Sequence, residues 1–237
     1  MKLRVMSFNI QHGFNYKTKA GIDFETMAEV IRRLDPDIVG LNEVRGLGKT
    51  ADYTAQAETI AAMIGYHCYF GRSIYVGGTE PYGNAVLSKF PIVGTKIIRI
   101  PDPVPRSSRV ESRTITRAEF ELPDGGGFAA YVSHFGLSKE EHEHAVSTAV
   151  TVLREEKLPF VLMGDFNMTP DNPLLEIFFE KLVSTAPYTD GKFSFPSDAP
   201  SCKIDYIFAS PGITVTNADI PHIVASDHCP IYADIEF

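Results

Sequence analysis

The chain contains no tryptophan and only three cysteines among its 237 residues. The cysteines are Cys68, Cys202 and Cys229; they lie far apart in the sequence and form no Cys-x-x-Cys pair, which excludes a disulfide framework and a zinc cluster. No hydrophobic run is long enough to cross a membrane, and no signal peptide precedes the first predicted strand. We therefore expect a cytoplasmic protein, although a secreted protein whose leader had been removed would look the same.

Positive charge is also scarce, because the formal net charge is -8. An acidic protein has no overall field that would attract nucleic acid, although a local basic patch could still do so. No broad basic stripe with interleaved aromatic residues occurs, and tryptophan is absent. These absences disfavour a protein that tracks along nucleic acid.

The remaining composition is that of an ordinary soluble globular chain, with 44% hydrophobic and 22% charged residues. Its length permits a sizeable core in one or two domains. Polar residues suited to a functional site extend from Asn9 to His228, so neither end can form a separate domain if these residues converge. We predict a single domain over residues 1–237 and a monomer.

Several predicted strands end in a polar group that can bind a metal or a phosphate. The clearest case is the buried strand Val161–Met163, which leads through Gly164 into Asp165-Phe166-Asn167. An isolated Asp-x-Asn would more often be a loop acid that caps the next helix. The same arrangement recurs, however, at other strand ends along the chain: Asn9, Glu43, His134, Asp205 and Asp227-His228. Such positions carry the active sites of α/β enzymes.

The predicted strands outnumber the predicted helices, and helices separate only some of the strands. Apolar spacing and capping residues predict helices near residues 23–34, 53–63, 138–156 and 173–182. The segments 72–81 and 185–201 read as loops, and we interpret His142 and His144 as solvated. Two packed mixed sheets with helices on their outer faces accommodate this pattern better than one open sheet.

Seven short motifs follow one another along the chain: Ser7-Phe8-Asn9, Asn42-Glu43, Gly83-Asn84-Ala85-Val86-Leu87-Ser88, Ser133-His134-Phe135-Gly136-Leu137, Gly164-Asp165-Phe166-Asn167, Lys203-Ile204-Asp205-Tyr206-Ile207-Phe208 and Ser226-Asp227-His228. The ordered set resembles the endonuclease/exonuclease/phosphatase family. That family includes deoxyribonucleases, abasic-site endonucleases, inositol polyphosphate 5-phosphatases and bacterial sphingomyelinases. The resemblance covers nearly the whole chain and implies an α/β fold, a four-layer α/β sandwich with its site between two sheets.

The resemblance implies that Glu43 is the principal metal ligand, with Asn9 beside it and Asp227 near the metal. Carboxylate and amide oxygens are hard ligands that suit Mg²⁺ or Mn²⁺. The family commonly has glutamine before the glutamate, whereas this chain has the shorter Asn42. We therefore expect the residues around the metal ligands to be arranged somewhat differently here.

A second group of predicted catalytic residues surrounds the reacting phosphate. Asp165 and Asn167 lie two positions apart, which places both side chains on one face of extended backbone. Their types suit activation of a water by Asp165 and hydrogen bonding to phosphate by Asn167. The resemblance further implies an Asp205–His228 pair, and His134 fits a phosphate donor. Whether Asp165 or His228 accepts the proton is left open by the sequence.

The predicted substrate-binding residues are Asn84, Arg106, Arg109 and Arg113. The three arginines lie within residues 101–113 and suit a phosphorylated substrate, although a solvated loop is the alternative. We predict an Mg²⁺- or Mn²⁺-dependent phosphodiesterase or phosphatase in which water attacks in line, with a small or lipid-derived substrate. A nuclease is the second candidate. A binding module with a dead site is disfavoured because the catalytic set is complete.

Overall fold

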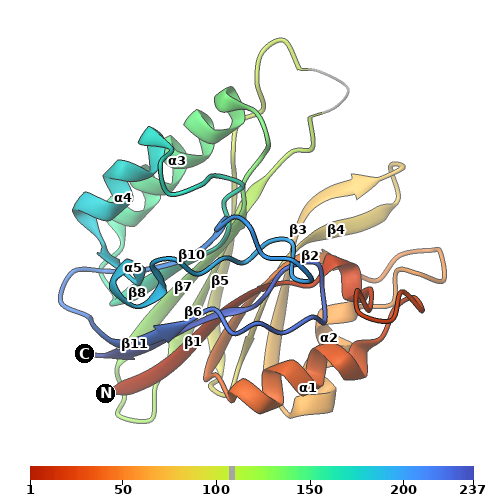
Figure 1. Ribbon diagram of the computed structural model, residues 1–237, viewed down its shortest axis with the longest axis horizontal. Helices are drawn as coiled ribbons and strands as arrows, with labels where there is room; N and C mark the ends of the chain where they lie inside the picture. Colours follow the sequence, from red (N-terminus) through yellow and green to blue (C-terminus); the bar gives the residue numbers. More distant parts are fainter. Residues whose placement is uncertain (107–109) are drawn as a thin grey trace.

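Two six-stranded mixed sheets pack face to face, and helices cover the outer face of each (Figure 1). The computed structural model describes residues 1–106 and 110–237. The predicted four-layer α/β sandwich is confirmed by this arrangement. Within the described ranges, no helix has the length and hydrophobicity that a membrane span requires.

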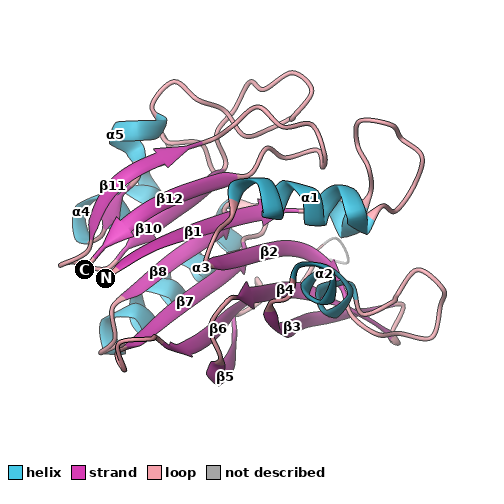
Figure 2. Ribbon diagram, turned by 90° about the horizontal axis from the view of Figure 1, so that it is seen from below, coloured by secondary structure: helices cyan, strands magenta, loops and turns pink. Residues whose placement is uncertain are grey.

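The first sheet has the strand order β11-β12-β1-β2-β4-β3, and α1 and α2 lie across its outer face (Figure 2). Its central strands β1 and β2 are parallel, and the other neighbouring strands are antiparallel. The elements of this half are β1 (Lys2–Asn9), α1 (Phe24–Leu34), β2 (Ile38–Arg45), α2 (Gln56–Ile64), β3 (His67–Val76), β4 (Glu80–Ser88), β11 (Thr214–Asp219) and β12 (Ile231–Glu236).

The second sheet has the order β5-β6-β7-β8-β10-β9 and again contains one parallel pair, β7 and β8, at its centre. Helices α3 and α4 lie together over its outer face (Figure 1). The elements are β5 (Ile92–Arg99), β6 (Thr114–Glu121), β7 (Gly127–His134), α3 (Lys139–Glu155), β8 (Phe160–Asp165), α4 (Glu176–Lys181), β9 (Val183–Ser184) and β10 (Asp205–Ala209). Short helical turns complete the chain: η1 (Gln11–Gly13), η2 (Pro173–Leu175) and α5 (Ala186–Thr189).

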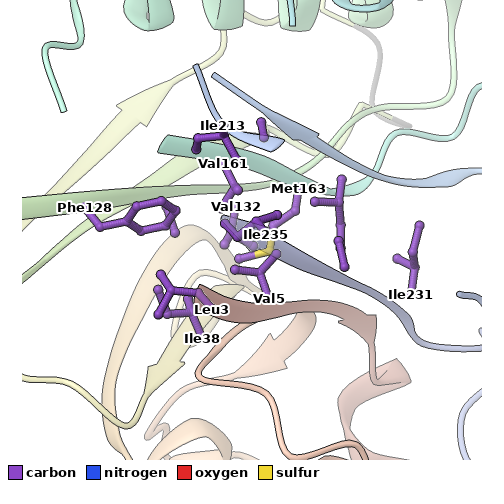
Figure 3. Close-up of a cluster of buried hydrophobic side chains, with 14 of the residues drawn as sticks. Leu3, Val5, Ile38, Phe128, Val132, Val161, Met163, Ile213, Ile231 and Ile235 are labelled. Carbon is purple, nitrogen blue, oxygen red and sulfur yellow. The ribbon is translucent and has the colours of Figure 1, made fainter. Parts of the chain in front are cut away.

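Three hydrophobic layers hold these four layers of secondary structure together. Alternate residues of a strand point to opposite faces, so Val5 of β1 faces the other sheet while Met6 faces α1 and α2. The layer between the sheets combines residues from both, including Val132 and Ile235 (Figure 3). Burying one side chain of this size stabilises the fold by roughly 1.5–3 kcal/mol.

The helix starts follow the predicted capping chemistry. The Asp23 side chain accepts a hydrogen bond from the backbone N of Thr26, and Ser138 and Glu141 form a capping box. The prediction that His142 is solvated was wrong. Its side chain is buried, because Gly136 in the connection from β7 to α3 contacts this face of the helix and its carbonyl oxygen lies 2.8 Å from His142 Nε2.

Two predicted loops also contain regular structure. Residues 72–81 form the part of the β3–β4 hairpin nearest its turn, which uses Gly77 and Gly78, both at positive φ. The strand continues through Ile74 to Val76 because these β-branched and aromatic residues favour extended backbone. Within residues 185–201, the short helix α5 replaces part of the expected loop.

The two parallel pairs determine where polar side chains gather. Strands β1 and β2 run in one direction and end at Asn9 and Arg45, while β7 and β8 end at His134 and Asp165. Strand β10 runs antiparallel to β8, with Asp205 opposite Asp165, so it begins where β8 ends. The polar ends of these strands therefore meet at one end of the sandwich.

Candidate active site

The buried carboxylate of Asp165 is the centre of the site. Its Oδ1 accepts a hydrogen bond from the backbone N of Asn167 at 2.9 Å, and its Oδ2 accepts one from Asn9 Nδ2 at 3.1 Å. The Nε2 atoms of His134 and His228 lie 3.5 and 3.6 Å from the same Oδ2. Four predicted site residues, from β1, β7, the turn after β8 and a C-terminal loop, thus surround one carboxylate.

Close packing at the end of β8 explains why Asp165 reaches this position. Gly164 has φ 146°, and a Cβ atom added there would lie 1.8 Å from the carbonyl oxygen of Ser133. Glycine is therefore required for β8 to approach β7 at this point. The register then places Asp165 opposite His134 on one side and Asp205 on the other.

His228 carries a positive charge between carboxylates. Its Nδ1 donates to Asp205 Oδ2 at 2.8 Å. Burial lowers the pKa of His228, but the negative charges of Asp205, Asp165 and Asp227 outweigh it and raise this pKa to about 10. The imidazolium is thus held in a fixed orientation, and its Nε2–H is directed toward Asp165.

The carboxyl of Asp165 has the opposite electrostatic balance. Burial raises its pKa, the charge of Asp205 raises it further, and the His228 imidazolium only partly offsets these effects. A carboxylate in this environment holds a proton more readily than one in water. Asp165 is therefore suited to accept a proton during a reaction.

His134 is neutral, and its tautomer follows from its neighbour. Arg113 Nη1 lies 3.1 Å from His134 Nδ1, and because arginine can only donate, Nδ1 is the acceptor and Nε2 carries the hydrogen. Burial lowers the pKa of His134 well below its usual value, and the positive charges of Arg113 and His228 lower it further. His134 therefore presents a neutral N–H donor to the site.

Several side-chain oxygen atoms lie together near Glu43, beside the residues that surround Asp165. Asn9 Nδ2 donates to Glu43 Oε1 at 3.1 Å, and Gln11 Nε2 donates to Asp227 Oδ2 at 2.9 Å. Burial and the nearby charge of Glu43 raise the pKa of Asp227. The buried Gln11 Oε1 has no hydrogen-bond partner among the described residues. This set of hard oxygen donors, one of them unsatisfied, fits a divalent cation such as Mg²⁺.

A second group of potential ligands consists of Asp165, Asp205 and His228, whose donor atoms all lie within 4.8 Å of one another. A histidine must be neutral to bind a metal through nitrogen. The raised pKa of His228 and its hydrogen bond to Asp205 therefore oppose metal binding by this group. The oxygen donors around Glu43 fit the cation better.

Two asparagines, Asn42 and Asn84, connect the two sheets next to Asp165. Asn42 Oδ1 accepts from the backbone N of Asp165 at 3.0 Å, and Asn42 Nδ2 donates to Asn84 Oδ1 at 2.9 Å. Asn84 Nδ2 in turn donates to the carbonyl oxygen of Thr114 at 3.2 Å. Asn84 thus lies in the cluster, but both atoms of its amide already bond to protein.

Two of the three predicted substrate arginines, Arg106 and Arg113, are described by the structure, and they lie in different environments. Arg113 is inside the cluster, where Nη1 also donates to Glu111 Oε1 at 2.6 Å. Arg106 instead bonds within its own loop, with Nε 2.8 Å from Asp102 Oδ2. Arg109 lies outside the described residues. Of the two described arginines, Arg113 reaches the residues around Asp165 through its contact with His134, and Arg106 does not.

Sequence reasoning missed three residues that contribute to the site. Gln11 comes two positions after Asn9, a spacing that could have marked it. Glu111 lies between Arg109 and Arg113, and the sequence around it matches no motif that would indicate a site residue. Burial, followed by the charge of Glu43, raises the pKa of Tyr82, which immediately precedes the Gly83-Asn84 motif. Glu111 and Tyr82 form acidic and aromatic surroundings of Arg113 and Glu43.

Comparison with known proteins supports this geometry. Residues 6–228 match the sequence profile of the Endonuclease/Exonuclease/phosphatase family. A search of curated proteins found no match. Among solved structures, an endonuclease/exonuclease/phosphatase from Beutenbergia cavernae is similar with a TM-score of 0.80 and 24% identity, over 100% of this chain and 72% of that one.

Two further structures show the same fold. The mannosyl-6-phosphatase of Bacteroides thetaiotaomicron has a TM-score of 0.83 and 18% identity, over 99% of this chain and 100% of that chain. The catalytic domain of human Nocturnin, solved with a bound sulfate, has a TM-score of 0.72 and 18% identity, over 100% and 94% of the two chains. The profile match spans nearly the whole chain and includes the polar strand ends from Asn9 to His228. The protein therefore belongs to the endonuclease/exonuclease/phosphatase family and is a metal-dependent hydrolase of phosphoester bonds.

Proposed function

We propose that this enzyme hydrolyses a small phosphodiester or phosphomonoester by in-line attack of a water that Asp165 activates. The observation that carries the proposal is the position of the Asp165 carboxylate, within 3.6 Å of the Nε2 atoms of two histidines. A group that accepts a proton and two groups that donate to phosphate oxygens thus lie at one point. Hydrolysis requires this combination.

Asp165 is better suited than His228 to take the proton from water. The raised pKa of Asp165 makes it a stronger base than an exposed carboxylate. His228 is already protonated because its pKa is raised to about 10. In this proposal, His228 therefore acts as a charged donor, with Asp205 holding its orientation.

The two imidazoles supply the hydrogen bonds to the developing phosphate charge. His228 offers a charged Nε2–H, and His134 offers a neutral Nε2–H whose tautomer Arg113 maintains. Asn167 Nδ2 donates to the carbonyl oxygen of Phe135 at 3.1 Å, so it would have to exchange that bond to contact a substrate. Such donors contribute most when they are fixed before the reaction.

Glu43, Asn9, Gln11 and Asp227 are the residues that would hold Mg²⁺ or Mn²⁺. When bound, the cation would neutralise charge on the phosphate and on the leaving oxygen. The carboxylates of Glu43 and Asp165 lie close together here, because Asn9 Nδ2 donates a hydrogen bond to each of them. Mutual repulsion of these carboxylates favours a cation at this position.

The preference for a small substrate is supported by the neutralised arginines. Arg113 pairs with Glu111 at 2.6 Å and Arg106 pairs with Asp102 at 2.8 Å, in a chain with a net charge of -8. Few cations in the described loop are left to bind successive backbone phosphates. The likeness in size and fold to a mannosyl-6-phosphatase gives further support to a small phosphoester substrate.

A nuclease is the second candidate, and one feature favours it. On the exposed β3–β4 hairpin, the Arg72 guanidinium lies 4.0 Å from the centroid of the Tyr75 ring. An exposed aromatic ring beside an arginine can stack with a nucleic-acid base. Double-stranded DNA would nevertheless require more phosphate contacts than this hairpin provides.

We expect a small phosphoester to be hydrolysed with a higher kcat/KM than plasmid or abasic DNA. The substrates compared would also include bis-p-nitrophenyl phosphate, inositol phosphates and phospholipid head groups, and each would be measured at low and moderate salt. Binding to duplex DNA loses affinity with salt by a power of roughly 0.9 for each phosphate neutralised, so a site for one phosphoester should show a shallow slope. A preference for DNA with a steep salt slope would establish the nuclease instead.

The Glu43→Gln variant is expected to bind Mg²⁺ about a hundredfold more weakly while folding normally, because a charged ligand at a partly exposed position is lost. Isothermal titration of the chelator-treated protein with Mg²⁺ would measure this change. Glu58→Gln is the matched control, since Glu58 is exposed on α2 and should not affect binding. Unchanged Mg²⁺ affinity in Glu43→Gln would remove Glu43 from the metal site.

A further inference from the structure

A pocket of about 680 Å³ lies at the end of the second sheet opposite Asp165. It is bounded by the C-terminal part of α3, by α4 and by the turn after β10, which includes Ser210 and Ile213. Phe160 lines the pocket and begins β8, whereas Asp165 ends that strand. At 3.3 Å per residue the two sites are roughly 17 Å apart, so this pocket is separate from the catalytic one.

The pocket wall is mainly hydrophobic. Its floor is formed by buried residues of two hydrophobic layers, including Phe178 and Ile213. Other apolar residues that line the pocket are only partly buried: Val150, Leu158, Ile177, Leu182 and Phe237. Exposed apolar surface gathered in one concave site indicates a ligand with an apolar part.

Three positively charged side chains also line this pocket. Arg154, Lys157 and Lys181 are exposed, and no carboxylate in the described part of the chain forms an ion pair with any of them. The acidic residue in the wall, Glu156, is already neutralised, because its Oε2 accepts from Arg117 Nε at 2.7 Å. The pocket is therefore a positively charged region on a protein whose net charge is -8.

We propose that this pocket binds an anionic amphiphile, an alkyl chain that ends in a carboxylate or a phosphate-like head group. The alkyl chain would lie against the apolar wall, and the head group would lie among Arg154, Lys157 and Lys181. The cavity volume is within the range of pockets that hold small molecules, about 300–1,000 Å³. A neutral hydrocarbon would leave the three cations without a partner, so charge complementarity selects an anion.

This site does not depend on the catalytic mechanism, and binding can be tested without an activity assay. Isothermal titration of the full chain, in chelator and below the micelle concentration, would use dodecanoate, dodecylphosphonate, dodecanol and dodecyltrimethylammonium. We expect each anion to bind with a stoichiometry of one, and at least about tenfold more tightly than the cationic amphiphile. The tighter of the two anions would identify the preferred head group.

Variants separate the charged and apolar parts of the site. Arg154→Gln combined with Lys157→Gln should weaken anion binding about tenfold and leave dodecanol binding unchanged, because only head-group contacts are removed. Val150→Trp should fill the cavity and weaken binding of all the amphiphiles. Lys17→Gln combined with Lys96→Gln is the matched control, since both lysines are exposed and lie outside the pocket.

The proposal is overturned if no anion binds, or if dodecyltrimethylammonium binds as tightly as the anions. It is also overturned if the control variant weakens binding as much as the Arg154/Lys157 variant. Sedimentation of the unliganded protein tests the alternative occupant, a second copy of the chain. A dimer that Val150→Trp dissociates, together with no amphiphile binding, would assign the pocket to subunit contact. Because the Arg154/Lys157 variant changes only exposed residues, the test stands even if Val150→Trp fails to fold.

Discussion

The Asp165→Asn variant is expected to lose about a thousandfold or more in kcat on the best small phosphoester. Asparagine has nearly the same shape, and its single oxygen can still accept the hydrogen bond from the backbone N of Asn167, although the bond from Asn9 to the second oxygen is lost. It cannot accept a proton from water, which is the role proposed for the carboxylate. The rate of single turnovers with saturating substrate and Mg²⁺ measures this loss directly, since substrate binding and product release then do not limit it.

The same substitution should not destabilise the metal-free fold. Burial and Asp205 raise the pKa of Asp165, which means that the ionised carboxylate is unfavourable in its surroundings. Removal of this buried charge offsets the lost hydrogen bond from Asn9, so thermal unfolding in chelator should show a midpoint close to that of the wild type. Asp124→Asn, in the exposed turn before β7, is the control and should leave both kcat and the midpoint unchanged. A kcat within tenfold of the wild type would contradict the role of Asp165 as the base.

The His228→Gln variant is expected to lose on the order of a hundredfold to a thousandfold in kcat, with a smaller change in KM. The lost group is a charged donor that acts mainly on the charge developing in the transition state. Steady-state kinetics on the same phosphoester would separate the two parameters. His67→Gln is the matched control because His67 is exposed at the far end of β3.

Asp205→Asn should reproduce part of the His228 effect. The Asp205 carboxylate accepts from His228 Nδ1 at 2.8 Å and is the leading cause that raises the pKa of this imidazole. With a neutral amide in its place, His228 should lose part of its positive charge at neutral pH. If Asp205→Asn and His228→Gln each reduce kcat, the double variant should be little worse than His228→Gln. Fully additive losses would show that the two residues act independently.

The fold could be predicted from the sequence because its signals are local and repeated. Buried strands such as Val161–Met163 are continuous apolar runs, and the capping residues Asp23 and Ser138 mark helix starts. The part of the β3–β4 hairpin nearest its turn was missed because Gly77 and Gly78 made residues 72–81 look like a loop. His142 was misjudged because its helix is highly charged, and only the tertiary packing shows which face it occupies.

The candidate site was less accessible to sequence reasoning, because contacts across the two sheets determine its chemistry. The motifs around Asp165 and His228 indicated that both residues belong to the site. The protonation state of each, however, depends on distances that a sequence motif does not contain. The neutral tautomer of His134 follows from Arg113, which comes from a different strand end. The unsatisfied oxygen of Gln11 indicates a metal ligand only when the position of Asp227 is known. Asp227 lies more than two hundred residues away in the chain.

The central claim is that the cluster around Asp165 hydrolyses a phosphoester with a divalent cation bound beside it. The most direct test measures hydrolysis of bis-p-nitrophenyl phosphate and p-nitrophenyl phosphate by the chelator-treated wild type and Asp165→Asn, during titration with Mg²⁺. We predict no activity in chelator, recovery in the wild type as Mg²⁺ is added, and no comparable recovery in Asp165→Asn. Full wild-type activity in excess chelator, or equal recovery in the two proteins, would contradict it.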